Sequence, residues 1–130
     1  MVTLGMMSPE ASGPTTALEN WREQLRRGGL DLAILLAVAP GPRYGLELIR
    51  YLEEYTDLVV AEGTVYPILA RLARDGLIRP EWVTRQGPHP RKYYHLTNRG
   101  RRQLDDMLEH WDGFVEKIGR LVRASGGRQS

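Results

Sequence analysis

The chain has 130 residues, of which 42% are hydrophobic, so it fits a single domain with a modest core and is not expected to be disordered throughout. It contains no cysteine, which excludes a disulfide framework and a thiolate metal site. The formal net charge is only +2, so a nucleic-acid partner has to be argued from where the basic residues lie.

Two targeting features are absent from the sequence. The longest apolar run, residues 32–39, is far shorter than the roughly 20 residues of a membrane span. The first residues also lack the basic and then apolar pattern of a signal peptide. We therefore expect a cytoplasmic protein without a membrane partner.

The N-terminal third of the chain changes character twice. Residues 1–16 lack periodicity and are rich in Met, Gly, Ser, Pro and Thr, so a disordered tail is expected. Residues 17–27 predict a short amphipathic helix, which the glycine pair at 28 and 29 should end or bend. Residues 30–39 are apolar almost all round, as in a central helix, and the Pro-Gly-Pro at 40–42 should end it.

A second core helix is expected over residues 44–54. It places Leu48, Ile49 and Leu52 on one face and charged residues on the other. Seven residues, 55–61, then form a short join that includes a β-like run at 58–60. Two helices with a short join lead into the helix that follows, an order typical of a helix-turn-helix.

The third helix carries the candidate reading surface. Val65, Ile68, Leu69 and Leu72 recur at helical spacing and form a core stripe. The opposite arc is small and hydroxylic at its start and positive further along, and such a face suits a major groove. Its candidate DNA contacts are Thr64, Tyr66, Pro67, Arg71 and Arg74.

The start of this helix has two alternatives. Thr64 could cap it and would place Pro67 in the first turn, where the missing N–H is harmless. A start at Glu62, after Ala61, would place Pro67 beyond that turn. Asp75-Gly76 should end the helix.

A two-stranded hairpin is predicted over residues 77–84 and 91–96, because both runs are rich in β-formers and turn residues separate them. Arg85, Arg91 and Lys92 surround its tip, where a projecting ribbon could follow a phosphate backbone or enter a minor groove. We expect Trp82 to lie in the hairpin core, together with whichever ring of the Tyr93-Tyr94 pair turns inward.

The last helix is predicted from about Asn98 to Arg123, with Thr97 as its cap. An apolar repeat with alternating steps of four and three residues forms a seam for another helix. A helix of this length, about 40 Å at a rise of ~1.5 Å per residue, exceeds what a small domain can cover, so a second copy of the chain is expected. The seam consists of Leu104, Leu108, Trp111, Val115, Ile118 and Val122.

A family resemblance is carried by three segments, YGLELIRYL, EGTVYPILARLARDGLI and RKYYHLTNRG, and by the tryptophan of EW, which lies between the last two. Through them the chain resembles the PadR family of bacterial transcriptional regulators over residues 25–122. The predicted elements already amount to a mainly α-helical fold with a small β-hairpin, in which a winged helix-turn-helix at 17–96 precedes a dimerisation helix at 97–124 and a disordered polar tail at 125–130. The resemblance implies a homodimeric repressor on a palindromic double-stranded DNA operator, and therefore an association with the nucleoid. Thr64, Tyr66 and Pro67 match the family's DNA-facing motif, and Arg91, Lys92 and Tyr93 match its wing.

Two positions depart from the family pattern. Ala61 stands where many members have serine, which weakens the helix cap, and His89 occupies a wing-tip position that is more often arginine, which suggests a weaker or pH-sensitive contact. Trp111 looks like the tryptophan that lines a pocket for flat aromatic effectors in multidrug-sensing members. Trp21, Met107 and Phe114 would complete that pocket. A seam residue without a ligand is the alternative for Trp111.

No catalytic arrangement and no cofactor site is evident, so an enzyme is not expected. The three histidines, at 89, 95 and 110, have no cysteine partners and no short ligand spacing, so a metal site is not expected either. A winged-helix module that binds another protein, without sequence-specific DNA binding, is the alternative function.

Overall fold

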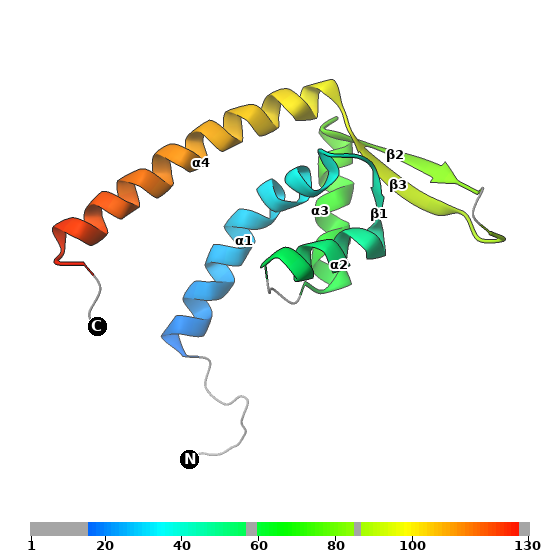
Figure 1. Ribbon diagram of the computed structural model, residues 1–130. Helices are drawn as coiled ribbons and strands as arrows, with labels where there is room; N and C mark the ends of the chain where they lie inside the picture. The colour runs from blue at the N-terminus through cyan, green and yellow to red at the C-terminus, as the bar shows by residue number, and fades with distance from the viewer. Residues whose placement is uncertain (1–15, 57–59, 85–86, 128–130) are drawn as a thin grey trace, which may run out of the picture. The chain divides into compact units, whose positions relative to one another are not determined.

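The computed structural model describes residues 16–56, 60–84 and 87–127. Figure 1 shows the elements in chain order, which are α1 (Ala17–Val38), β1 (Arg43–Tyr44), α2 (Gly45–Thr56), α3 (Glu62–Arg74), β2 (Ile78–Val83), β3 (Arg91–Leu96) and α4 (Asn98–Ala124). The expected fold class, mainly helical with a small sheet and a long last helix, is confirmed. Among the described helices, none combines the length and the apolar character needed to cross a membrane.

Some expectations fall outside the described residues. They are the tail at 1–15, most of the β-like run at 58–60, and the last three residues of the C-terminal tail. Of the β-like run only Val60 is described, and it is buried.

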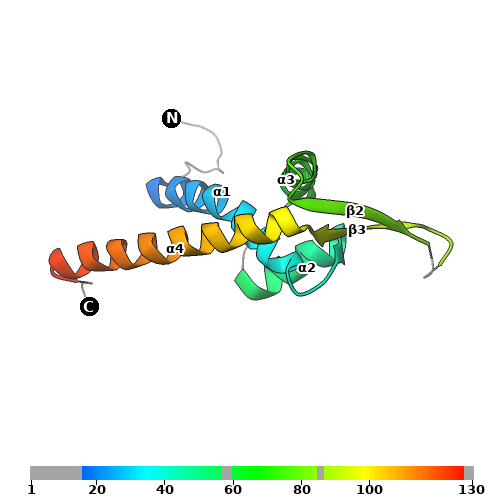
Figure 2. The same cartoon turned by 90° about the horizontal axis from the view of Figure 1, so that it is seen from above.

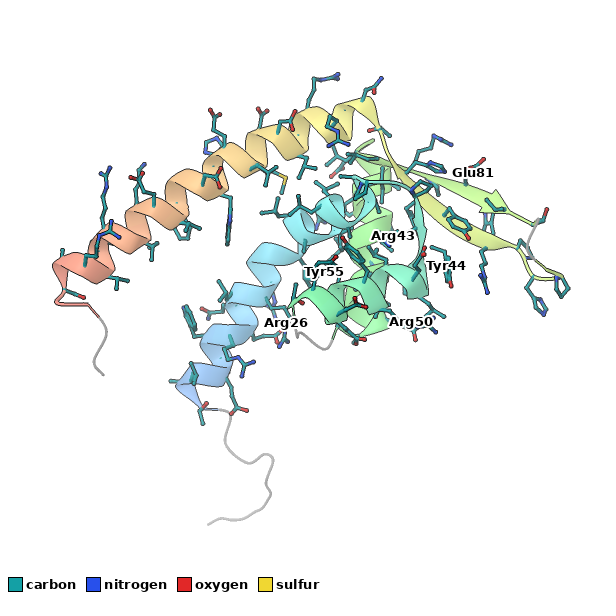
Figure 3. The ribbon with its side chains drawn as sticks, in the orientation of Figure 1. Arg26, Arg43, Tyr44, Arg50, Tyr55 and Glu81 are labelled. Atoms are coloured by element: carbon teal, nitrogen blue, oxygen red, sulfur yellow. The ribbon has the colours of Figure 1, made fainter. Side chains whose placement is uncertain are left out.

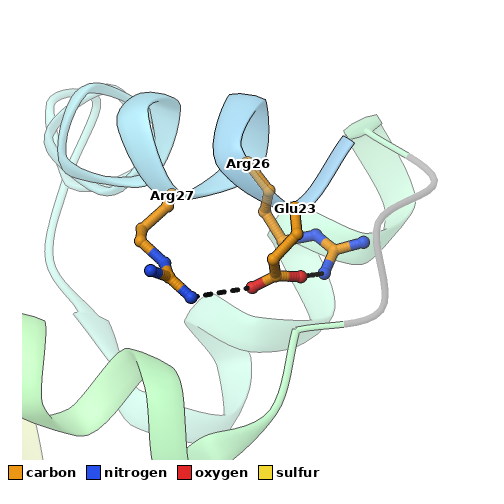
Figure 4. Close-up of polar contacts among 3 residues, drawn as sticks. All are labelled: Glu23, Arg26 and Arg27. Carbon is orange, nitrogen blue, oxygen red and sulfur yellow. Dashed lines mark hydrogen bonds and ion pairs between the residues drawn. The ribbon is translucent and has the colours of Figure 1, made fainter. Parts of the chain in front are cut away.

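The chain divides into two compact units, Met1–Leu30 and Asp31–Ser130, and α1 crosses the boundary. In the first unit Thr16 and Glu19 cap α1 reciprocally, each side chain accepting a hydrogen bond from the other residue's backbone N–H at 2.9 and 3.0 Å. Further along, Glu23 Oε1 lies 2.7 Å from Arg26 Nη1 and Glu23 Oε2 lies 3.8 Å from Arg27 Nη2 (Figure 4).

The glycine pair at Gly28 and Gly29 does not end a helix, because α1 runs through both positions. Of the two expected outcomes, an end and a bend, the end is therefore wrong. A Cβ at either glycine would meet nothing within 4 Å. Each glycine costs about 1 kcal/mol of helix propensity, which neighbouring turns can tolerate. The helix ends at Val38, before the Pro-Gly-Pro, as expected.

The second unit has a core built from the apolar stripes that the sequence predicts. Its members come from the last turns of α1, from α2, from α3, from the sheet and from the start of α4. Together with Val60 before α3, the buried side chains are Ile34, Leu35, Ala37, Val38, Leu48, Ile49, Leu52, Val65, Leu69, Leu72, Ile78, Tyr94 and Leu104. Ile68, the fourth member of the α3 stripe, is half-buried at its edge.

The sheet has three antiparallel strands in the order β1-β3-β2, one more than the predicted hairpin. The added strand, β1, pairs Arg43 with Tyr94 and Tyr44 with Tyr93. It covers only the inner part of β3, and the β2–β3 ribbon continues past it as a projecting wing (Figure 2).

A tight junction links α3 to α4. After Asp75, Gly76 adopts a φ of 77°, and the N–H groups of Gly76 and Leu77 donate to the carbonyls of Ala73 and Leu72, which closes α3 as expected. Thr97 begins α4, and its Oγ1 accepts from Gly100 N at 2.9 Å.

The same junction holds the two helices in register. The Thr97 hydroxyl oxygen lies 2.7 Å from the Gly76 carbonyl and 3.1 Å from that of Leu77, to either of which it can donate. A Cβ at Gly100 would collide with the carbonyl oxygen of Leu77. Glycine at position 100 therefore lets the first turn of α4 approach the backbone that follows α3.

Candidate nucleic-acid interface

The outward arc of α3 begins at a weakly capped helix end. Ala61 is the N-cap and makes no side-chain hydrogen bond, so the helix begins at Glu62 and Pro67 lies inside it. The alternative in which Thr64 caps the helix is wrong. The N–H groups of Thr64 and Val65 both donate to the Ala61 carbonyl, at 3.0 and 3.1 Å, which stabilises the first turn without a polar side chain.

The arc brings Thr64, Tyr66 and Pro67 to the surface, as the helical spacing predicts. Tyr66 is 37% exposed, and its ring lies against the start of α2. A Cβ at Gly45 would lie 2.6 Å from Tyr66 Cε1 and 2.8 Å from Cζ, so glycine at position 45 leaves room for that ring. Burial, assisted by the Glu62 carboxylate, raises the pKa of Tyr66.

The two arginines of α3 differ in their surroundings. Arg71 donates from Nη2 to Asp31 Oδ1 at 2.8 Å and so ties α3 to α1. This contact raises the pKa of Arg71 and commits its charge to the protein itself. Arg74, one turn further along, is exposed and forms no ion pair within the described residues.

The wing presents its basic residues beside aromatic rings. The Arg91 guanidinium carbon lies 4.5 Å from the centre of the Tyr44 ring, and Tyr44 packs edge-on against Tyr93. Lys92 Nζ lies 5.7 Å from the Trp82 ring. His89 is exposed at the tip, whereas Arg85 lies outside the described residues.

Trp82 is not in the hairpin core, and this expectation is wrong. Its side chain is 64% exposed, whereas Tyr94 is only 6% exposed. In the register of the sheet, Ile78, Pro80 and Trp82 oppose Leu96, Tyr94 and Lys92, so all six share one face. On that face Ile78 and Tyr94 are buried, whereas Trp82 and Lys92 are exposed and belong to the part of the wing that projects beyond the core.

A groove of about 510 Å³ lies where α3, the start of α2 and the wing meet. Tyr66 contributes from α3, and the wing contributes Trp82, Arg91, Lys92 and Tyr94. The remaining lining residues are Tyr44 at the end of β1 and Gly45, Leu46 and Arg50 on α2. Figure 3 labels Tyr44 and Arg50 on these two elements. Among the described residues, the lining contains three cations and no carboxylate.

These last four residues are absent from the sequence-based list of candidate contacts. YGLELIR reads as a core helix, because the apolar spacing of Leu48, Ile49 and Leu52 dominates it. The signal that could have indicated the groove is the Tyr-Gly pair just before that helix, since glycine at a helix start often marks a close approach of another group.

The candidate dimer seam divides into a buried and an exposed part. Leu104 is buried and Leu108 is half-buried, so the first turns of α4 pack on their own chain. The later seam residues, Trp111, Val115, Ile118 and Val122, are exposed. Of the four residues expected at an effector pocket, Met107 is half-buried, whereas Trp21, Trp111 and Phe114 are exposed. Within the described residues, no group of three or more His, Cys, Asp or Glu side chains could hold a metal ion.

Comparison with known proteins identifies relatives of this architecture. A family model described as the transcriptional regulator PadR-like family matches residues 34–106, more than half of the chain. A PadR-like transcription factor from Bacteroides fragilis is similar, with 40% identity and a TM-score of 0.65 over 78% of this chain and 98% of that one. A PadR family regulator from Eggerthella lenta has 31% identity and a TM-score of 0.74, over 81% of this chain and 91% of that one. A PadR-like regulator from Bacillus cereus has 32% identity and a TM-score of 0.70, over 76% and 96%.

Proposed function

Because the chain belongs to the PadR-like family of transcriptional regulators, which bind DNA and are not enzymes, we propose that it is a homodimeric repressor of a palindromic operator. Each protomer inserts α3 in one major groove, and the two half-sites lie about one helical turn, ~34 Å, apart. The observation that carries this proposal is that Tyr66 on α3 and Arg91 and Lys92 on the wing line one groove, whose described lining residues include no carboxylate.

The residues of α3 and of the wing contact different parts of the DNA. Thr64, Tyr66 and Pro67 lie at the exposed start of α3 and contact base edges, and Arg74 supplies a guanine or phosphate contact. Arg91 and Lys92, together with Arg85 and His89, hold the flanking backbone. Arg71 contributes to DNA binding only if its pair with Asp31 opens, so its first role is to position α3.

The partner of α4 in this proposal is α4 of a second copy. Its later turns expose Trp111, Val115, Ile118 and Val122 in a repeat suited to helix pairing. An aromatic effector bound beside Trp111 would release the operator by binding the two arrangements of the reading helices with different affinity.

The test is footprinting on the DNA upstream of the protein's own gene, followed by a titration of affinity against salt. A repressor of this kind protects two symmetric half-sites, and its log affinity falls linearly with log salt, by about 0.9 per neutralised phosphate. A protein-interaction module would protect no site and would show no binding to duplex DNA that falls steeply with salt. In that case the proposal falls.

A further inference from the structure

The groove between α3 and the wing has the charge of a phosphate-binding surface. Its cations, Arg50, Arg91 and Lys92, come from two elements that are far apart in the sequence, and none of the described residues that line it is a carboxylate. Tyr66 of α3 and Trp82 of the wing also line it. Because the lining is shared by α2, α3 and the wing, an anionic chain that passes between these elements can meet all three cations.

The geometry of duplex DNA supplies such a chain. The major and minor grooves are separated by a single sugar-phosphate backbone. A protein that places α3 in the major groove and its wing at the neighbouring minor groove must therefore let that backbone pass between the two elements. The residues that line this passage then meet phosphates and deoxyriboses in every operator, whatever its base sequence.

We propose that this groove is the path of that backbone, with Arg50 as a phosphate contact and Trp82 as a packing surface for a deoxyribose. The inference rests on the proposed function, because it assumes that α3 and the wing bind duplex DNA. It adds two residues to the interface, neither of which belongs to the reading arc of α3 or to the basic tip of the wing.

Arg50 suits a phosphate because its charge is uncommitted. It is exposed on α2, and its side chain forms no ion pair or hydrogen bond within the described residues. The neighbouring Arg43 is different, since its Nε donates to the Ala37 carbonyl at 2.6 Å and its guanidinium lies 3.6 Å from the centre of the Tyr51 ring. Arg43 therefore stabilises the fold, and Arg50 is left for a partner.

Trp82 suits a sugar because its large apolar ring is 64% exposed. Lys92, opposite it in the sheet, lines the same groove, and its Nζ lies 5.7 Å from the centre of the Trp82 ring. A deoxyribose has an apolar face next to an anionic phosphate, so Trp82 and Lys92 together match both parts of one nucleotide.

The test compares Arg50→Ala with Arg120→Ala, a matched change at an exposed arginine on α4 that pairs with Glu116. Affinity is measured for operator and for random duplex DNA over a range of salt, on variants shown to have the wild-type melting temperature. Arg50→Ala should weaken both DNAs to a similar extent and should reduce the salt slope by about 1, as loss of one phosphate contact requires. Arg120→Ala should leave the slope unchanged.

A second measurement addresses Trp82 and the position of the backbone. DNA should quench part of the tryptophan fluorescence of the wild type, and Trp82→Phe should remove that part. The position of the backbone is tested with operators in which one phosphate per half-site is replaced by a neutral methylphosphonate. When the replaced phosphate lies between the bases read by α3 and those read by the wing, the wild type should bind more weakly than it binds the unmodified operator. Arg50→Ala should bind these two operators equally well.

The outcomes separate this inference from the function on which it rests. If the wild type binds the operator with a steep salt dependence but Arg50→Ala retains the full slope and the methylphosphonate sensitivity, the backbone path is wrong and DNA binding stands. Retention of the DNA-induced quenching in Trp82→Phe would likewise remove the sugar contact. If the wild type shows no salt-dependent binding, both the path and the proposed function fall.

Discussion

Gly100 shows how one residue can set the spacing between two helices. Replacing it with alanine would drive a Cβ into the Leu77 carbonyl and within 2.9 Å of the Leu77 carbonyl carbon, in a place where backbone, not a flexible side chain, would have to move. We expect Gly100→Ala to lower the free energy of unfolding by about 3 kcal/mol, the upper range for overpacking. Urea unfolding measures this change.

The matched control lies in the same helix. A Cβ at Gly113 meets nothing within 4 Å, so Gly113→Ala should gain up to about 1 kcal/mol from helix propensity. A similar loss of stability at both positions would show that the contact with Leu77 is not the cause.

Substitutions of Arg71 and of Arg74 should have different effects, although the sequence places both residues on the outward arc of α3. Arg74→Ala should weaken operator binding about tenfold with little change in melting temperature, because its side chain makes no ion pair in the described residues. Arg71→Ala should lose stability instead, by less than about 1 kcal/mol, since its pair with Asp31 is partly exposed. Binding titrations and thermal melts on both variants measure these two effects. Equal losses of affinity with unchanged melting would return Arg71 to the DNA site.

Tyr94 makes the fold sensitive to alkaline pH. Burial, and then the neighbouring Tyr66 phenol, raise the pKa of Tyr94. Above pH ~10, the ordinary tyrosine value, the unfolded chain loses this proton while the native state keeps it, so the free energy of unfolding falls as pH rises further. Below that pH the group contributes no slope. Tyr94→Phe should reduce the decline above about pH 10 when urea unfolding is measured at each pH. An identical decline in the variant would contradict this origin.

At the scale of elements, α4 has two parts that differ in their surroundings. Its first turns are fixed to the rest of the chain through Thr97 and Leu104, whereas its later turns expose an apolar face. Val115→Glu places a charge in the middle of that face and should dissociate the proposed dimer, because an unpaired charge in an apolar seam is strongly unfavourable. Light scattering measures the mass. Lys117→Glu, also on α4 but off the seam, is the control, and a Val115→Glu variant that stays dimeric would refute the seam.

Which elements the sequence predicts depends on how many residues carry the pattern. α3 and α4 follow from repeats of apolar residues over several turns, and the end of α3 follows from Asp75-Gly76. β1 has only two residues, which are too few to show any alternation. It forms because the free edge of β3 at Tyr93 and Tyr94 is available for pairing. Trp82 was misplaced for a related reason, since alternation gives the face of a strand but not the distance it projects beyond the core.

At the scale of the whole molecule, the candidate site is assembled from segments that no local pattern connects. Tyr44, Arg50, Tyr66 and Trp82 meet at one groove, although they come from a strand end, two helices and the wing. The arc of α3 and the wing cations could be predicted because each lies on a single element. The groove could not, because it depends on where α2 lies relative to both, which tertiary packing decides.

The proposed effector pocket can be tested on the intact chain. Trp111 is one of three tryptophans in the sequence, so comparison with Trp111→Phe shows which part of the fluorescence it supplies. If Trp111 stacks on a ligand at the dimer interface, flat aromatic compounds should quench that part in a saturable way and should lower operator affinity in parallel. No response across a broad panel would leave Trp111 as a seam residue.

The Thr97 junction turns α4 into a lever. The helix is about 40 Å long at a rise of ~1.5 Å per residue, and its first turn is hydrogen-bonded to the residues that close α3. A tilt of about 5° about the far end of α4 displaces its first turn, and α3 with it, by roughly 3.5 Å, which is close to the spacing of ~3.4 Å between stacked base pairs. In the proposed dimer, a small change of angle where the exposed turns pair would therefore shift each α3 by about one base-pair step.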